Sequence, residues 1–348
     1  MRLMRDLHRW IKKRLVARLV SPASPRPMPY PPARIGILSW ERWGDAILLT
    51  SLVRGLHRGF PQAELTVFTF SDASKQFFHQ FCQEYPWLQY RFYERLTQLR
   101  TSELPPFDWL INTKDHFSAT FTLALASIPH RYRIGFAHPD YARYLHLPVV
   151  TPYEMPIIEK YRSLLQRVGA AISDESLRPV IPLQSVRPAI WQWIEQHRND
   201  RPIGINLSAG HPDRCLTEAQ VRAIIEHFAP HPVILFAVGA QQSIVPTLAR
   251  HYPSVLLPPS PASIFEAAAL LQATALLISP DTALVHAASA LRTPVVVLYL
   301  NQHRFAERFA PYRVPYRRLI TNGATIATIS TSSLIRAIEA LWAAQNEA

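Results

Sequence analysis

The sequence predicts an α/β protein with two Rossmann-like domains, each a doubly wound parallel sheet with helices on both faces. Strand-like runs alternate with helical patterns through both halves of the chain. The length of 348 residues favours two domains over one. Two segments, 34–56 and 275–299, each read as a strand, a turn and a helix with a carboxylate at the start of the helix. Because helix N-termini hold anions, we expect a ligand in a cleft between facing domains.

The first 33 residues differ in composition from the rest. Residues 1–20 hold seven Lys and Arg and one Asp, which is +6 of the formal net charge of +12. Their apolar residues recur near helical spacing, so we expect a basic amphipathic helix. It could bind an anionic membrane surface, or it could pack on its own protein or on a partner. The proline-rich residues 21–33 are expected to form a stiff linker.

Residues 34–185 are predicted to form the first Rossmann-like domain. Its expected strands are 35–39, 65–70, 89–93, 108–112 and 131–136. Its expected helices are 46–58, 72–82, 116–127 and 153–169. A proline-rich stretch, 176–188, is the expected interdomain linker.

Residues 186–348 repeat the alternation and are predicted to form the second domain. Its expected strands are 203–208, 233–238, 255–257, 276–279 and 295–299. Its expected helices are 217–228, 263–272 and 331–345, and the first two begin with capping-box patterns.

Asp45 follows Gly44 at the turn after the first predicted strand, where a doubly wound sheet binds ligands. An Asp at this position could also be only a helix cap. The single glycine, in place of a G-x-G-x-x-G run, argues against a dinucleotide. Trp40 and Trp43 could stack on a sugar ring or belong to the core. The candidates on the acceptor side are Trp40, Arg42, Trp43 and Gly44.

In the second half, Thr282 and His286 lie one helical turn apart near the start of a predicted helix, directly after Asp281. They could bind a diphosphate while Asp281 accepts from sugar hydroxyls, or they could be a cap and a core histidine. The loop 208–214 adds two small residues, Ala209 and Gly210, that let a backbone approach a ligand closely. It ends in Arg214, which could neutralise a phosphate or be an ordinary surface arginine.

These segments, in order, resemble glycosyltransferase family 9, the lipopolysaccharide heptosyltransferases. The family's Gly-Asp turn and following helix match Gly44, Asp45, Thr50, Leu52, Val53, Arg54 and Leu56. Its N-P-G-A loop and basic residue match Asn206, Leu207, Ser208, Ala209 and Arg214. Its S-x-D-[TS]-G-x-x-H pattern and the strand entry after it match Ser279, Asp281, Thr282, Ala283, His286, Ala290, Thr293, Pro294, Val295 and Val296.

The chain departs from the family pattern around the donor. Ala283 stands in place of Gly, Arg214 in place of Lys, and Leu216 with Thr217 in place of Trp-Pro. Gln241 stands where some members place a Glu against the nucleotide. These departures bear on which nucleotide and sugar are used more than on the class of reaction.

The resemblance implies a GT-B type inverting glycosyltransferase, with Asp45 as general base and a nucleotide-diphosphate sugar, ADP-heptose among the candidates, as donor. The implied donor-binding residues are Ser208, Ala209, Gly210, Arg214, Gln241, Asp281, Thr282, Ala283 and His286. The implied acceptor is a lipid-linked saccharide of the lipopolysaccharide core. The alternatives are a sugar-nucleotide epimerase of similar architecture and a non-catalytic nucleotide-sugar-binding protein.

We expect no cofactor, no metal and no nucleic-acid partner, because no D-x-D motif occurs and the basic charge gathers in one appended helix. Cys82 and Cys215 lie in different predicted domains without metal-ligand spacing. The N-terminus lacks an uninterrupted apolar run, and no stretch approaches about 18 apolar residues. The expected location is therefore the cytoplasm, with peripheral attachment to the inner face of the inner membrane through residues 1–20.

Overall fold

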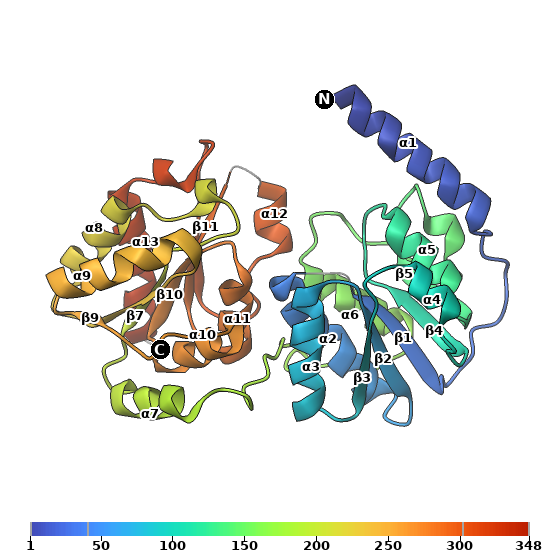
Figure 1. The fold of residues 1–348 in the computed structure, drawn as a ribbon, viewed down its shortest axis with the longest axis horizontal. Coiled ribbons are helices and arrows are strands. Elements are labelled where there is room, and N and C mark those ends of the chain that lie inside the picture. The colour runs from blue at the N-terminus through green and yellow to red at the C-terminus, as the bar shows by residue number, and fades with distance from the viewer. Residues whose placement is uncertain (1, 40–41, 301–302, 347–348) are drawn as a thin grey trace. The chain divides into compact units, whose positions relative to one another are not determined.

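The computed structural model describes the chain except for residues 1, 40–41, 301–302 and 347–348. It contains two compact units, Met1–Leu177 and Arg178–Ala348, and each has one six-stranded sheet flanked by helices (Figure 1). The predicted α/β class, with two parallel sheets, is confirmed.

The sheet of unit 1 is parallel throughout and has the order β3-β2-β1-β4-β5-β6. Its strands are β1 (Arg34–Ser39), β2 (Glu64–Thr69), β3 (Leu88–Phe92), β4 (Phe107–Asn112), β5 (His130–Phe136) and β6 (Leu147–Val149). Its helices are α1 (Arg2–Leu19), α2 (Trp43–Gly59), α3 (Asp72–Glu84), α4 (Thr97–Thr101), α5 (Ala119–Ser127) and α6 (Ile157–Arg167), with a short 3-10 helix η1 (Ala142–Tyr144). Strand order reverses between β1 and β4, where Leu38 pairs with Asn112.

Unit 2 repeats this topology with the order β12-β11-β10-β7-β8-β9, again all parallel. Its strands are β7 (Ile203–Asn206), β8 (Val233–Phe236), β9 (Val255–Leu256), β10 (Leu276–Pro280), β11 (Val295–Tyr299) and β12 (Tyr316–Ile320). Its α-helices are α7 (Pro188–His197), α8 (Glu218–Phe228), α9 (Val245–His251), α10 (Ile264–Leu270), α11 (Ala283–Leu291), α12 (His303–Arg308) and α13 (Thr331–Asn346). Its 3-10 helices are η2 (Pro212–Arg214), η3 (Gly239–Ile244), η4 (Leu271–Ala273) and η5 (Ile326–Thr328).

Two edge strands, β6 and β12, are additions to the sequence prediction. β6 has three residues, and β12 carries two arginines in the sequence YRRLI. β6 is too short to show an alternating pattern and contains a proline, and in β12 the arginines interrupt any apolar run, as is common in edge strands. Each sheet therefore has six strands where the sequence predicted five.

The N-terminal segment belongs to unit 1, whereas the sequence placed the first domain from residue 34 onward. The second half of α1 packs beside α5, and the side chains of Val16 and Val20 join the core there (Figure 1). Lys13 Nζ forms an ion pair with Asp140 at 2.6 Å. The C-terminal half of α1 therefore packs on its own protein, which is one of the two alternatives that the sequence left open.

The proline-rich residues 21–33 also lie along unit 1, held by hydrogen bonds. The indole Nε1 of Trp109 donates to the carbonyl of Pro29 at 2.8 Å, and Asp108 accepts from the backbone N–H of Ala33 at 2.7 Å. Both partners are on β4, a central strand. The segment is therefore fixed to the domain by hydrogen bonds. Its prolines stiffen a segment that lies on the surface of unit 1, not a free linker between α1 and the domain.

The boundary between the units follows Leu177, eight residues before the boundary that the sequence placed after residue 185. The Arg178 guanidinium donates to the carbonyl of Ser289 at 3.0 Å, so the chain joins unit 2 within the proline-rich stretch. Further along, Arg187 forms an ion pair with the buried Glu266 at 2.6 Å. In the parts of the chain that the structure describes, no helix is long and apolar enough to cross a membrane.

Candidate functional site

In an open α/β sheet, ligands bind outside the carboxyl ends of the strands where the strand order reverses. This switch point lies between β7 and β10 in unit 2, and between β1 and β4 in unit 1. The segments that the sequence singled out follow three of these four strands. Each unit therefore has one candidate crevice.

In unit 2, the crevice contains a network of neutral polar side chains at the start of α11. The Asn206 amide donates to the hydroxyl oxygens of Ser279 at 2.9 Å and Thr282 at 3.1 Å. Thr282 is the N-cap residue of α11, yet its side chain makes no capping hydrogen bond. The Val285 N–H donates to the Thr282 carbonyl at 3.1 Å. Because no side chain caps the helix, the N–H groups of Ala283 and Leu284 can serve an anionic ligand.

The loop after β7 lies beside this helix end. Arg214 points at the turn that precedes α11, with its Nη1 3.5 Å from the carbonyl oxygen of Asp281. Gly210 lies close to this arginine. A Cβ atom added at Gly210 would be 3.4 Å from Nη2 of Arg214. The structure thus brings together 206–214 and 279–286, two segments about 70 residues apart in the sequence.

Ser208 and Ala209 are placed by contacts within the loop. The Ser208 hydroxyl is buried, donates to the Val238 carbonyl at 3.1 Å and accepts from the Val238 N–H at 2.8 Å. It thereby fastens the β7 loop to the end of β8. The Ala209 N–H approaches the thiol of Cys215 at 3.4 Å. These two residues shape the loop that carries Arg214.

His286 and Asp281 both lie in low-dielectric surroundings. Burial lowers the pKa of His286 to about 4, and its Nδ1 has no hydrogen-bond partner. His286 is therefore neutral at pH 7, which limits it to neutral hydrogen bonding with a phosphate. Burial raises the pKa of the Asp281 carboxyl, and the nearby Arg214 acts in the opposite direction. The carboxyl oxygens of Asp281 can accept hydrogen bonds from sugar hydroxyls. Ala283 is the first residue of α11.

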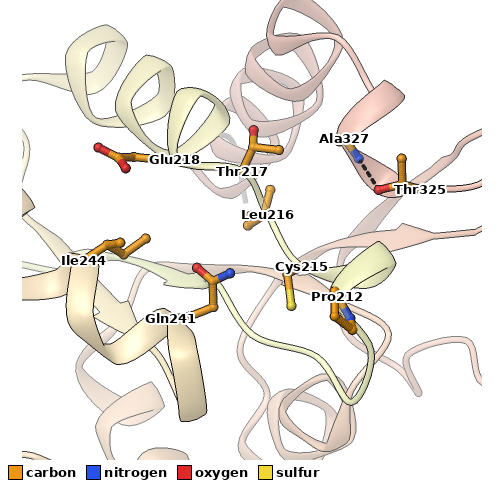
Figure 2. A pocket seen from close by; sticks show the side chains of 9 residues that line it. All are labelled: Pro212, Cys215, Leu216, Thr217, Glu218, Gln241, Ile244, Thr325 and Ala327. Carbon is orange, nitrogen blue, oxygen red and sulfur yellow. Dashed lines mark hydrogen bonds between the residues drawn. The ribbon is translucent and has the colours of Figure 1, made fainter.

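Gln241 lies on η3 and lines a cavity of about 330 Å³ at the same edge of unit 2 (Figure 2). Figure 2 shows its amide and the thiol of Cys215 at this cavity, together with Thr217, Glu218 and Ile244. The lining combines an amide, a hydroxyl and a carboxylate with apolar carbon. The cavity lies between the loop after β7, the start of α8, η3 and the residues around η5.

In unit 1, Asp45 is the third residue of α2, and its Oδ2 accepts from the backbone N–H of Arg42 at 3.2 Å. It is therefore a capping residue, as the bland interpretation requires, and its side chain is also partly exposed at the carboxyl edge of the sheet. Trp43 and Gly44 are half-buried in the same turn. Trp40 lies outside the described residues. The geometry is compatible with both roles of Asp45.

The loop after β4 follows the second strand of the unit 1 switch point, and the sequence did not predict a role for it. Lys160 of α6 is 1% exposed and forms an ion pair with the Asp115 carboxylate, while also donating to the Tyr153 carbonyl at 2.9 Å. Thr113 donates to the Leu38 carbonyl of β1 at 2.7 Å. The loop is thus anchored to both α6 and β1.

A signal for this ion pair exists in the sequence. Lys160 precedes Leu164 by four residues and shares its apolar helix face. A lysine on such a face is almost never buried without a partner. The partner, Asp115, lies 45 residues away, and only the folded chain shows it. In the part of the chain that the structure describes, no group of three or more His, Cys, Asp or Glu could hold a metal ion.

Comparison with known proteins gives the family. Residues 97–327 match the family model for glycosyltransferase family 9 (heptosyltransferase), which is more than half of the chain. This protein belongs to glycosyltransferase family 9. It is accordingly a glycosyltransferase, and the resemblance stated from its motifs is confirmed. No curated protein is similar enough in sequence to count as a relative.

Solved structures of family 9 proteins share the fold. The chain is similar to a glycosyl transferase family 9 structure from Veillonella parvula, with a TM-score of 0.68, 16% identity and coverage of 92% of this chain and 99% of that one. It is also similar to E. coli ADP-heptose lps heptosyltransferase II, with a TM-score of 0.62, 20% identity and coverage of 90% of this chain and 100% of that one. For E. coli heptosyltransferase WaaC with ADP, the TM-score is 0.68, the identity 13%, and the coverage 88% of this chain and 99% of that one. The GT-B-like class, two parallel six-stranded sheets with flanking helices, is thereby shown.

The family 9 match contains the unit 2 crevice and begins after the Asp45 turn. Residues 206–214 and 279–286 lie inside the matched range, whereas 42–45 lie before it. The roles of the individual site residues, Asp45 above all, therefore stay predictions. The loop with Asp115 and the helix with Lys160 are inside the range.

Proposed function

We propose that this glycosyltransferase is an inverting enzyme that moves a sugar, heptose in the first instance, from a nucleotide-diphosphate sugar to a lipopolysaccharide-core-type acceptor. The observation that carries the proposal is the unit 2 crevice. There, N–H groups at the start of α11 that no side chain caps lie near the Arg214 side chain. Among the described contacts, no carboxylate forms a salt bridge with Arg214. This combination suits a diphosphate.

The donor would lie with its diphosphate at the start of α11. The N–H groups of the first turn and Arg214 would bind the phosphate oxygens, while Asp281 would accept from sugar hydroxyls. Gln241 would face the nucleoside from η3. Since one structure of similar fold contains ADP, ADP-heptose is the first donor to test. The proposal needs no cofactor, and no step passes through a metal.

The acceptor would be activated by Asp45 in unit 1. Its carboxylate takes the proton of the acceptor hydroxyl while that oxygen forms a bond to the anomeric carbon of the donor. The bond from this carbon to the diphosphate oxygen breaks, and its electron pair leaves with the nucleoside diphosphate. Attack opposite the leaving group inverts the anomeric configuration. The N–H groups of α11 and Arg214 stabilise the charge that develops on the diphosphate.

A binding screen followed by a transfer assay tests this function. ADP, UDP, GDP and CMP sugars are titrated by calorimetry, and the donor that binds is then offered with lipid-linked and delipidated core saccharides. We expect nucleotide release only with an acceptor, and a product of inverted anomeric configuration by NMR. Release of nucleotide without an acceptor would favour the epimerase alternative. Donor binding without turnover on any acceptor would favour a binding protein and contradict the proposal.

We also propose that the enzyme works in the cytoplasm, peripherally on the inner face of the inner membrane. The reason is chemical, since a lipid-linked acceptor is available only at a membrane surface. Cell fractionation would place the protein with membranes and release it by high salt without detergent. Recovery entirely in the soluble fraction at low salt would contradict this location.

A further inference from the structure

The outer face of α1 is the densest exposed apolar surface among the described residues. Four large apolar side chains within ten residues, Trp10, Ile11, Leu15 and Leu19, are 48–60% exposed. Ile11, Leu15 and Leu19 are spaced four residues apart and so form one row along the helix. The rest of unit 1 leaves this row uncovered.

Two arginines line the same face. Arg14 and Arg18 are exposed and follow Trp10 at the same four-residue spacing, which makes a second row beside the apolar one. The Arg14 guanidinium lies 4.0 Å from the centre of the Trp10 ring. No Asp or Glu occurs between positions 7 and 33. The face therefore combines apolar and cationic groups without a compensating carboxylate in the segment.

The opposite side of α1 is fixed to unit 1. Val16 and Val20 are at most 2% exposed in the core beside α5, and Lys13 is paired with Asp140. With 3.6 residues per turn, these positions lie across the helix from the two exposed rows. The orientation of the exposed face is thus set by the fold of the domain, and α1 is not a tethered arm.

We propose that this face, residues Trp10, Ile11, Arg14, Leu15, Arg18 and Leu19, docks on an anionic lipid bilayer. Apolar side chains would enter the boundary between headgroups and acyl chains, and the arginines would contact anionic headgroups, as interfacial helices do. A second copy of this chain fits less well, because pairing the face with itself would bring the arginines together. Because α1 is fixed, docking would hold unit 1 in one orientation on the membrane.

The proposal rests on the proposed function for its biological purpose, access to a lipid-linked acceptor, and its test needs neither donor nor acceptor. The full chain is sedimented with vesicles of equal parts phosphatidylglycerol and phosphatidylethanolamine, and with phosphatidylcholine vesicles. We expect binding to the anionic vesicles only, with loss as salt rises. Loss of transferase activity with intact vesicle binding would remove only the proposed function.

Two face variants locate the binding. Arg14→Gln with Arg18→Gln should weaken partitioning into anionic vesicles roughly 30-fold, at about fivefold for each charge near such a surface. Ile11→Ser with Leu15→Ser and Leu19→Ser should weaken it at least about tenfold. All five side chains are exposed, so circular dichroism should show folded proteins.

Matched controls lie elsewhere on the chain. Arg250→Gln with Arg336→Gln removes the same charge from exposed positions of unit 2, and Val150→Ser removes an apolar side chain that is 84% exposed. Both should bind as the unaltered chain does. Equal binding of face and control variants would overturn the proposal. So would the absence of binding to anionic vesicles together with a dimer, in analytical ultracentrifugation, that the triple serine variant abolishes.

Discussion

The two units share one topology, yet their switch-point crevices are built from different chemistry. In unit 2, neutral groups organise the site: Asn206 holds Ser279 and Thr282, and the buried His286 is uncharged. In unit 1, a buried ion pair between Lys160 and Asp115 anchors the loop. We therefore expect the two crevices to have different roles. A neutral network leaves helix N–H groups available for an anion, whereas a buried ion pair holds the loop after β4 in place.

The largest expected effect is on the unit 1 side, at Asp45. Asp45→Asn should lower kcat by about 10² to 10⁴, because the amide cannot take the proton of the acceptor hydroxyl. The amide oxygen can still accept from the Arg42 N–H, so the helix cap is kept. Steady-state kinetics and calorimetry with the donor measure the two effects separately. Full activity per folded molecule would reduce Asp45 to a cap.

Breaking the ion pair of unit 1 should cost stability. Lys160→Met keeps the apolar stem but leaves the Asp115 carboxylate buried without its cation, at about 3–5 kcal/mol. The double variant with Asp115→Asn should recover part of this loss. Urea unfolding measures both, and Glu159→Gln on the same helix is the control. If the single variant is as stable as the control, the pair does not anchor the loop.

In unit 2, the corresponding test removes the charge beside α11. Arg214→Ala should weaken binding of the nucleoside diphosphate by roughly 1.5–3 kcal/mol, the contribution of a charge-assisted hydrogen bond. Calorimetric titration with ADP gives the difference, and Arg198→Ala, at an exposed position on the same unit, is the control. An unchanged affinity would remove Arg214 from the donor site.

His286 predicts how the stability of unit 2 depends on pH. Its pKa is about 4 when folded and 6.5 as the ordinary value, so the unfolded chain binds a proton that the folded chain does not. Stability is therefore retained above about pH 6.5 and is lost as pH falls toward 4. Between pH 7 and 5, the titration of His286 should lower the free energy of unfolding by about 2 kcal/mol.

The pH effect is measured by comparing unfolding of the unaltered chain with that of His286→Gln, which does not titrate. The variant should show a shallower loss of stability between pH 7 and 5. His146 in unit 1 also has a pKa lowered to about 4, by burial and by the charge of Arg133, and remains in both proteins. Parallel stability curves would mean that His286 is accessible to protons in the folded chain.

The smallest expected effect concerns the neutral network itself. Thr282→Val removes one acceptor of the Asn206 amide, which keeps its bond to Ser279. We expect a loss of about 1 kcal/mol in the free energy of unfolding. Thermal unfolding checks this, with Thr217→Val, which removes the cap of α8, as a reference of similar size. A much larger loss would show that the network acts as a cooperative unit.

The segments that form the unit 2 crevice could be picked out from the sequence because they are short and carry local signals. A strand followed by small residues, and a strand followed by Asp281 and Thr282 at a helix start, predict a ligand edge from sequence alone. The unit 1 loop was not predictable in this way. The apolar helix face around Lys160 indicates that this lysine needs a partner, but no local signal identifies Asp115 as that partner. The edge strand β12 was missed because its arginines hide its pattern.

The sequence by itself determined the alternation of strands and helices, the two parallel sheets and the family, since periodicity, capping and turn residues act over a few positions. Only the tertiary structure decided that α1 is fixed to unit 1 through Val16 and Val20, and that His286 is neutral. It also paired Lys160 with Asp115. These properties depend on burial and on contacts between distant residues, which exist only after the chain has folded.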